Sequence, residues 1–285
     1  MKAKMRGRIF GMLIIALILC IGAAAAFMRG GRRDVGMDEA SFHYVALGDS
    51  IPNGYSVSEE QDMEGYPRIL MEELREVKGY SVSFSEYTKN GITADGLCER
   101  YLSDVKVQEE IKNADLVTVT AGANDILKRC RELYKEIFGE DAKVQDMETF
   151  FSAFQKRMAE NPELAAKAAE IMKGWRWEEF EEDWKRMMDS IQKNRKKSCR
   201  VIVTTLYNPV GEKEGFRMLN LYIEQQIGRV NDIIMEYQEV YGYQAADIRE
   251  AGMEEHLQAD GLHPDGDGQR IIAGRVWSLF MKERL

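Results

Sequence analysis

The chain has 285 residues, 45% of them hydrophobic, and its formal net charge is −9. This length and apolar content allow one sizeable domain with its own core. The acidic balance argues against nucleic acid as a partner, because phosphate binding needs a basic surface. The four cysteines are widely spaced and include no C-x-x-C pair, so a structural zinc site is not supported, and we expect neither a metal nor another cofactor.

An uncharged, largely apolar run extends from Ile9 to Met28, with basic residues on both sides. A helix needs about 20 apolar residues to cross a bilayer, whereas the apolar core of a secretory signal has about 7 to 15. Length therefore favours an uncleaved anchor in residues 1–28, followed by a linker in 29–40. Ala23 to Ala26 leave cleavage and secretion as the alternative. The basic flanks slightly favour a cytoplasmic amino terminus, so we expect residues 41–285 outside the cell membrane.

From residue 41 onward, short β-branched or aromatic runs alternate with longer helical stretches. Strands are predicted at Phe42–Leu47, Tyr80–Tyr87, Leu116–Thr120, Arg200–Leu206 and Gln244–Ile248. Helices are predicted at Tyr66–Val77, Leu219–Tyr241 and Gly268–Met281, where apolar residues recur at helical spacing. This alternation is typical of an α/β domain with a parallel sheet and crossover helices.

The stretch from about 130 to 197 is longer than a crossover between two strands requires, and we expect a helical insertion there. It concentrates aromatic and sulfur-containing side chains, including Trp175 and Trp184. One interpretation is that these side chains form the contact between the added helices and the main core. The other is a cap over an apolar pocket with Trp175 and Trp184 against a substrate, because methionines and aromatics form adaptable apolar walls.

The first predicted strand ends in V-A-L-G-D-S-I, which places Gly48, Asp49 and Ser50 where the chain turns toward a helix. Ligands of open α/β sheets bind beyond the carboxyl ends of the strands. A serine there can present its hydroxyl at a helix N-terminus, whose amides favour developing negative charge. Gly-Asp-Ser is also an ordinary turn sequence, so Ser50 becomes a candidate nucleophile only with suitable partners.

Two further strand ends supply groups that can stabilise an oxyanion. The third strand ends in T-A-G-A-N-D, and the neutral amide of Asn124 can donate a hydrogen bond to a forming oxyanion. An Asn-Asp pair also caps helices, which is the structural alternative. The second strand runs into T-K-N-G-I-T, where Gly91 can bring a bare backbone N–H to the same edge.

The segment A-D-G-L-H-P-D near the carboxyl terminus places Asp260 and His263 three residues apart, ahead of the last helix. A serine nucleophile needs a base, and the chain has three histidines. His43 lies at the start of the first strand, and His256 has no comparable acidic partner. In a turn, Asp260 can accept from one ring nitrogen of His263 while the other faces Ser50.

Together these motifs resemble the SGNH/GDSL hydrolase family. The resemblance rests on G-D-S-I at Gly48–Ile51, on Gly91, on G-A-N-D at Gly122–Asp125 and on D-G-L-H-P at Asp260–Pro264, in that order. It implies a three-layer α/β/α, flavodoxin-like fold with about five parallel strands.

The same resemblance implies a serine hydrolase of carboxylic esters. Ser50 is then the nucleophile and His263 the base, oriented by Asp260. The oxyanion hole comprises the amides of Ser50 and Gly91 and the side chain of Asn124.

The substrate stays open, because the insertion at 130–197 departs from the family pattern and Ile51 replaces its usual leucine. T-L-Y-N-P at Thr205–Pro209 is similar to lipase- or acylhydrolase-like bacterial members with an N-terminal membrane segment, which favours an acyl ester, including lipid. A carbohydrate O-acetyl esterase acting on cell-wall or surface polysaccharide uses the same catalytic groups. A membrane-tethered binding protein without activity is the alternative from another class.

Overall fold

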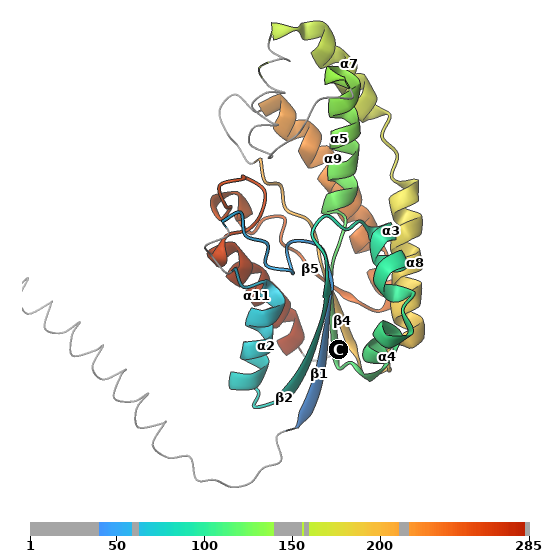
Figure 1. Cartoon of the computed structure of the whole chain (residues 1–285), viewed down its shortest axis with the longest axis vertical. Coiled ribbons are helices and arrows are strands. Elements are labelled where there is room, and N and C mark those ends of the chain that lie inside the picture. The colour runs from blue at the N-terminus through green and yellow to red at the C-terminus, as the bar shows by residue number, and fades with distance from the viewer. Residues whose placement is uncertain (1–39, 59–62, 140–155, 157–159, 211–216, 283–285) are drawn as a thin grey trace, which may run out of the picture. The chain divides into compact units, whose positions relative to one another are not determined.

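A computed structural model describes residues 40–58, 63–139, 156, 160–210 and 217–282, in which strands and helices alternate (Figure 1). The strands are β1 (Ser41–Gly48), β2 (Ser81–Thr88), β3 (Leu116–Thr120), β4 (Arg200–Thr204) and β5 (Gln244–Ala246). The longer helices are α2 (Tyr66–Glu76), α4 (Val105–Asn113), α5 (Ala123–Phe138), α7 (Pro162–Lys173), α8 (Glu178–Asn194), α9 (Arg217–Glu236) and α11 (Gly266–Met281). Short helical segments are α3 (Ala94–Leu97), η1 (Cys98–Leu102), α10 (Gln238–Tyr241) and η2 (Met253–Glu255).

The five strands form one parallel sheet in the order β2-β1-β3-β4-β5, which is the flavodoxin-like order. Gly48 at the end of β1 pairs with Thr88 of β2 and with Thr120 of β3. The carboxyl ends of these three strands therefore finish at the same edge. The order reverses between β1 and β3, which is where sheets of this kind bind ligands.

Helices cover both faces of the sheet. Successive side chains of a strand point to opposite faces, so both faces carry apolar side chains that the helices shield from water. Tyr44 and Ala46 of β1 lie in the core under α2 and α11. Val45 and Leu47 lie in the core on the other side, with buried residues of α3, α4, α8 and α9. Burial on both faces explains why the central strands β1, β3 and β4 are almost continuously apolar. The predicted three-layer α/β/α fold is confirmed.

The predicted elements agree closely with the observed ones, and the main difference is in the longest helix. The sequence predicts a single helix to Tyr241, but α9 ends at Glu236 and the short α10 follows. Tyr237 between them leaves helical geometry, with φ −86° and ψ 3°. The chain then reverses at Gly242, which adopts a left-handed conformation, before β5 begins.

The described residues of the 130–197 range pack in different ways. α5 begins before this range, at Ala123, and α8 packs on the sheet as the crossover helix between β3 and β4. The buried residues Phe180, Trp184 and Met187 of α8 recur at helical spacing and share a core with the strands. The interpretation of a contact with the main core therefore holds for Trp184. The additional structure lies between α5 and α8, where α7 contacts α5.

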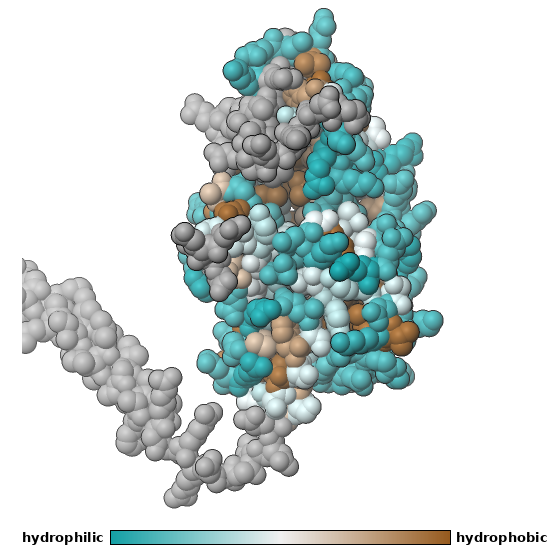
Figure 2. All heavy atoms as spheres, viewed as in Figure 1, coloured by the Kyte–Doolittle hydropathy of each residue, from teal (hydrophilic) through white to brown (hydrophobic). Residues whose placement is uncertain are grey.

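Within the described ranges, no helix is both long and apolar enough to cross a membrane. The run from Ile9 to Met28 lies outside those ranges, so the membrane anchor stays a prediction. Hydrophilic side chains cover most of the face on which α5 and α8 lie (Figure 2).

Candidate active site

Ser50 follows β1, and Asn124 lies in the first turn of α5, directly after β3. These two strands flank the point where the strand order reverses. Gly48 allows the chain to turn here: a Cβ on this residue lies 2.6 Å from the carbonyl oxygen of Thr120 and 2.7 Å from Cγ of Pro52. The close approach of β1 to its neighbour therefore requires glycine immediately before the Asp-Ser pair.

The residues after β1 form a compact turn. The N–H of Tyr55 donates to the carbonyl of Ser50 over 3.0 Å, and the N–H of Ile51 donates to Oδ1 of Asp49 over 3.0 Å. The prediction that Ser50 lies at a helix N-terminus is wrong, since α2 begins only at Tyr66. The side chain of Asp49 makes the bond that a helix N-cap makes, but Gly54 adopts a left-handed conformation, with φ +68°, and the chain does not continue as a helix.

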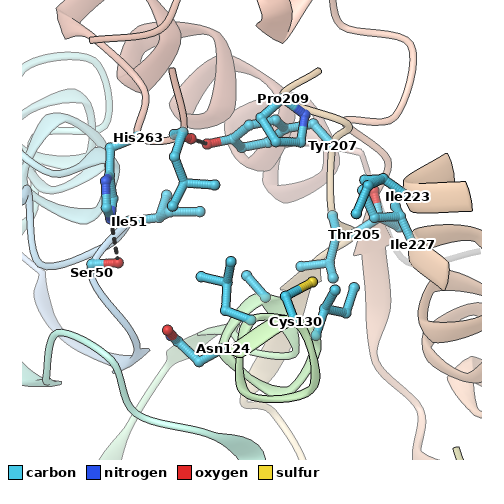
Figure 3. A pocket seen from close by; sticks show the side chains of 15 residues that line it. Ser50, Ile51, Asn124, Cys130, Thr205, Tyr207, Pro209, Ile223, Ile227 and His263 are labelled. Atoms are coloured by element: carbon cyan, nitrogen blue, oxygen red, sulfur yellow. Dashed lines mark hydrogen bonds between the residues drawn. The ribbon is translucent and has the colours of Figure 1, made fainter. Parts of the chain in front are cut away.

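His263 and Asp260 lie in the loop between η2 and α11. Nε2 of His263 is 2.9 Å from Oγ of Ser50 (Figure 3), and its Nδ1 is 2.5 Å from Oδ2 of Asp260. The other oxygen of Asp260 accepts the backbone N–H groups of Leu262 and His263, both over 3.0 Å. The structure therefore brings the predicted carboxylate, imidazole and hydroxyl together in one chain of hydrogen bonds.

The electrostatics of this loop favour an ionised carboxylate. Burial raises the pKa of Asp260, but hydrogen bonds from the ring and the backbone of His263 outweigh it and leave the pKa below its usual value. An ionised carboxylate at Nδ1 stabilises a protonated imidazole and fixes the neutral ring so that Nε2 accepts. The arrangement can therefore take the proton from the Ser50 hydroxyl.

Gln258 is a site residue that sequence reasoning missed. Its Nε2 donates to the carbonyls of Tyr55 and Pro264, both over 2.8 Å, and its Oε1 accepts the N–H of Val57 over 2.9 Å. The side chain thus joins the loop that follows Ser50 to the loop that carries His263. No motif marks it, because its partners on the Ser50 side lie about 200 residues earlier in the chain.

Two tyrosines also hold the histidine loop. The ring of Tyr55 lies against the ring of His263, with centroids 4.4 Å apart. The hydroxyl of Tyr207 donates to the carbonyl of Leu262 over 2.6 Å. Burial raises the pKa of Tyr207 well above its usual value, so this hydroxyl stays protonated. The T-L-Y-N-P segment was the signal that could have identified Tyr207.

Asn124 is buried, and its Nδ2 donates to Oδ2 of Asp49 over 3.4 Å. Gly122 brings α5 close to its neighbours, with φ +114° and with Val230 3.0 Å from the position of an added Cβ. Burial raises the pKa of Asp49 to about 6, against the opposing effects of the Ile51 N–H and of His263. The carboxylate orients the amide of Asn124, which also lines the pocket described below.

Gly91 lies in the exposed turn after β2, with φ +78°. This turn is joined to the Ser50 turn by a hydrogen bond of 2.8 Å from Nδ2 of Asn53 to Oδ1 of Asn90. The turn that contains Gly91 therefore adjoins the Ser50 turn. Gly91 is not among the described residues that line the pocket.

A pocket opens beside Ser50 and His263 and extends between α5 and α9 (Figure 3). Its walls are largely apolar. The lining residues beyond the site itself include Ile126, Leu127 and Cys130 of α5, Leu206 and Pro209 after β4, and Ile223 and Ile227 of α9. Trp175 and Trp184 are not among the fifteen residues that line it. Trp184 is fully buried against Phe180 and Tyr243 instead, and Trp175 borders a separate open groove.

Several known proteins are similar to this chain. Uncharacterized protein YpmR of Bacillus subtilis (strain 168) is 27% identical over 300 residues, and the match covers 99% of both sequences. The lipase Lip_vut3 from a goat rumen metagenome has a TM-score of 0.59 at 18% identity, over 84% of this chain and 97% of that one. A variant of the acetyl xylan esterase Axe2 from Geobacillus stearothermophilus has a TM-score of 0.51 at 17% identity, over 87% of this chain and 99% of the esterase chain.

The two solved structures share the fold with this chain, while the sequence match to a family is more specific. The GDSL-like lipase/acylhydrolase family matches residues 46–271. That range covers most of the chain and includes the Ser50 turn, the start of α5 and the loop with Asp260 and His263. The chain therefore belongs to the GDSL-like lipase/acylhydrolase family of ester hydrolases.

Proposed function

We propose that this chain is a serine hydrolase of carboxylic esters, with Ser50 as nucleophile and His263 as general base, oriented by Asp260. The observation that carries the proposal is the hydrogen-bond chain from Ser50 through His263 to Asp260 at the mouth of an apolar pocket. Ser50 Oγ attacks the ester carbonyl while Nε2 of His263 takes the proton. The protonated ring then returns the proton to the leaving alcohol, and water releases the acid by the same route.

The proposed oxyanion hole comprises the Ser50 amide, the Gly91 amide and Nδ2 of Asn124. A donor in such a hole must be fixed before the charge develops. The contact with Asp49 supports this role for Asn124, because it holds the amide beside Ser50 in a buried setting. For Gly91 the support is the family pattern and the hydrogen bond that ties its turn to the Ser50 turn.

The pocket favours esters with an apolar acyl group. Its lining of isoleucine, leucine and cysteine side chains offers an acyl chain a surface shielded from water. A carbohydrate O-acetyl esterase is the second candidate, since the catalytic groups suit acetate esters equally. An acetyl group, however, leaves most of the apolar wall unused. The binding-protein alternative is disfavoured because all of the proposed catalytic groups are present.

Replacing the nucleophile tests the proposal. Ser50→Ala should lower kcat for a p-nitrophenyl ester by about 10⁴-fold or more, as the loss of a serine nucleophile does elsewhere, with an unchanged melting temperature. A fluorophosphonate probe should label the wild-type protein at Ser50 and leave the variant unlabelled. Full esterase activity in folded Ser50→Ala, or no labelling of folded wild type, would end the proposal.

We propose further that residues 1–28 attach the protein to the cell membrane, with the hydrolase outside. The support is the uncharged run from Ile9 to Met28 and its basic flanks. Protease treatment of intact cells should remove the domain. Protection until lysis contradicts this location, and recovery of a shortened chain in the medium favours signal cleavage.

A further inference from the structure

The direction of the apolar pocket follows from how α5 and α9 pass the sheet edge. α5 starts at that edge, after β3, and runs away from the sheet. α9 leads to the start of β5 at the opposite edge, and its Val230 lies beside Gly122 at the beginning of α5. The residues of α9 before Val230 therefore extend beyond the sheet edge alongside α5, antiparallel to it (Figure 1).

The lining residues of the two helices follow this arrangement. Ile227 and Ile223 precede Val230 by three and seven residues, so they lie on the same face of α9. On α5, Asn124 is next to Ser50, and Cys130 is the lining residue farthest from it along the helix. Among the residues that the structure describes, the pocket lining thus runs from the hydrogen-bonded cluster to the level of Cys130 and Ile223.

The next buried residue of α5 beyond Cys130 belongs to the packed core. Leu133, three residues further along α5, is buried but does not line the pocket. Cys130 itself is buried, and burial raises the pKa of its thiol to about 12. The residue therefore presents a neutral, apolar surface at the end of the cavity.

The dimensions of the cavity correspond to a chain of limited length. Cys130 follows Asn124 by six residues, which is about 9 Å along a helix axis. An extended hydrocarbon chain, with carbon–carbon bonds of about 1.5 Å, covers this distance with about six to eight carbons.

We propose that this pocket takes the acyl chain of the ester and that Cys130 sets the longest chain that fits, which makes the protein selective for medium-chain esters. This inference rests on the proposed ester-hydrolase function. Each methylene that enters an apolar pocket is favoured by burial, so kcat/KM should rise about three- to fourfold for each methylene group added. The increase should stop near the octanoyl ester, because further carbons meet the packed residues beyond Cys130.

The test compares p-nitrophenyl esters from acetyl to palmitoyl with the wild type and two variants. Cys130→Ala enlarges the end of the pocket and should raise the decanoyl-to-hexanoyl ratio of kcat/KM by at least about threefold. Cys130→Phe fills the end and should lower the octanoyl-to-butanoyl ratio by at least about tenfold. Cys98→Ala is the matched control, because Cys98 is also buried but lies on η1, outside the pocket, and it should keep the wild-type profile.

The outcomes separate this inference from the function on which it rests. An active wild type whose rates rise steadily to palmitoyl, or are highest with acetyl, overturns the length limit alone. A chain-length profile of Cys130→Ala that equals the wild-type profile also overturns the length limit. If Cys130→Phe does not fold, the result with Cys130→Ala alone tests the limit. A folded wild type that hydrolyses none of the esters and is not labelled by fluorophosphonate overturns both proposals.

Discussion

Two regions meet at the candidate site and are held in different ways. The edge loops, residues 48–58 and 256–265, contain Ser50 and His263 and are fixed by directional hydrogen bonds among short loops. The helical pocket between α5 and α9 is lined mainly by apolar side chains, which no hydrogen bond can fix in place. Hydrogen bonds demand particular groups at particular positions, whereas apolar packing demands mainly volume. The chemistry should therefore respond to single-atom changes, and the substrate range to changes in volume.

Asn124 tests this comparison most severely, because it belongs to both regions. Asn124→Ala should lower kcat by about 10²- to 10³-fold, since one oxyanion donor is lost. The preference among acyl chain lengths should stay as in the wild type, because the apolar walls are unchanged. Steady-state kinetics with butanoyl and octanoyl esters measures both quantities. A variant with normal kcat and an altered chain-length preference would show that Asn124 acts as a wall of the pocket.

Gln258 tests whether the edge loops act as one unit. Gln258→Leu removes the bonds to Tyr55, Val57 and Pro264 and should lower kcat about 10- to 100-fold, the effect of a small misplacement of reacting groups. KM should change little, because the pocket is untouched. The rate of fluorophosphonate labelling at Ser50 should fall in parallel with kcat.

The matched control for this positioning role is Gln238→Leu. The side chain of Gln238 also bonds to backbone, accepting the N–H of Ala245 over 2.9 Å, but it lies at α10, away from the site. If both variants lose stability equally and the labelling rate of Gln258→Leu is normal, the role of Gln258 is structural only.

Asp125 gives the smallest expected effect and separates stability from chemistry. It is next to Asn124 in sequence, but its Oδ2 accepts the N–H of Ala94 over 3.2 Å. Burial raises its pKa to about 7, so the ionised form is disfavoured in the folded protein, and this destabilisation develops as pH rises from about 4 through 7. Asp125→Asn should therefore raise the melting temperature at pH 8 by about a few degrees and have little effect near pH 4.

Asp247 serves as the control, because its pKa is shifted in the opposite direction from that of Asp125. Hydrogen bonding to Arg249 lowers the pKa of Asp247 to about 2, so its ionised form stabilises the fold above about pH 4. Asp247→Asn should lower the melting temperature at pH 8, as thermal unfolding monitored by circular dichroism will show. A melting temperature of Asp125→Asn that is unchanged between pH 4 and 8, relative to wild type, contradicts the raised pKa.

The sheet could be predicted largely because its three central strands are buried on both faces. All five strands appear within a few residues of their predicted positions. For β1, β3 and β4 the reason is that a doubly buried strand is a nearly continuous run of β-branched and apolar residues. Ser50 and His263 could be located because few residue types can act as a nucleophile or as its base. The turn at Ser50 could not, because the left-handed conformation of Gly54 that ends it depends on a close approach to Gly65, which adjoins it only after folding.

The pocket could not be predicted from the sequence. Apolar residues at helical spacing indicate that a helix face is buried, but not which neighbour that face contacts. Trp184 and Ile227 both lie on helices and both belong to the same core cluster, yet only Ile227 also lines the pocket. Gln258 likewise has partners that adjoin it only after folding.

The sequence by itself determined the parallel α/β sheet and the identities of the groups beside Ser50, because local pattern and chemical type suffice for both. Only the tertiary structure decided that α5 and α9, and not the tryptophans of the 130–197 region, line the pocket at those groups. The physical reason is that burial stabilises any apolar face equally. The relative directions of the helices, which follow from the order and register of the strands, select the face that borders Ser50.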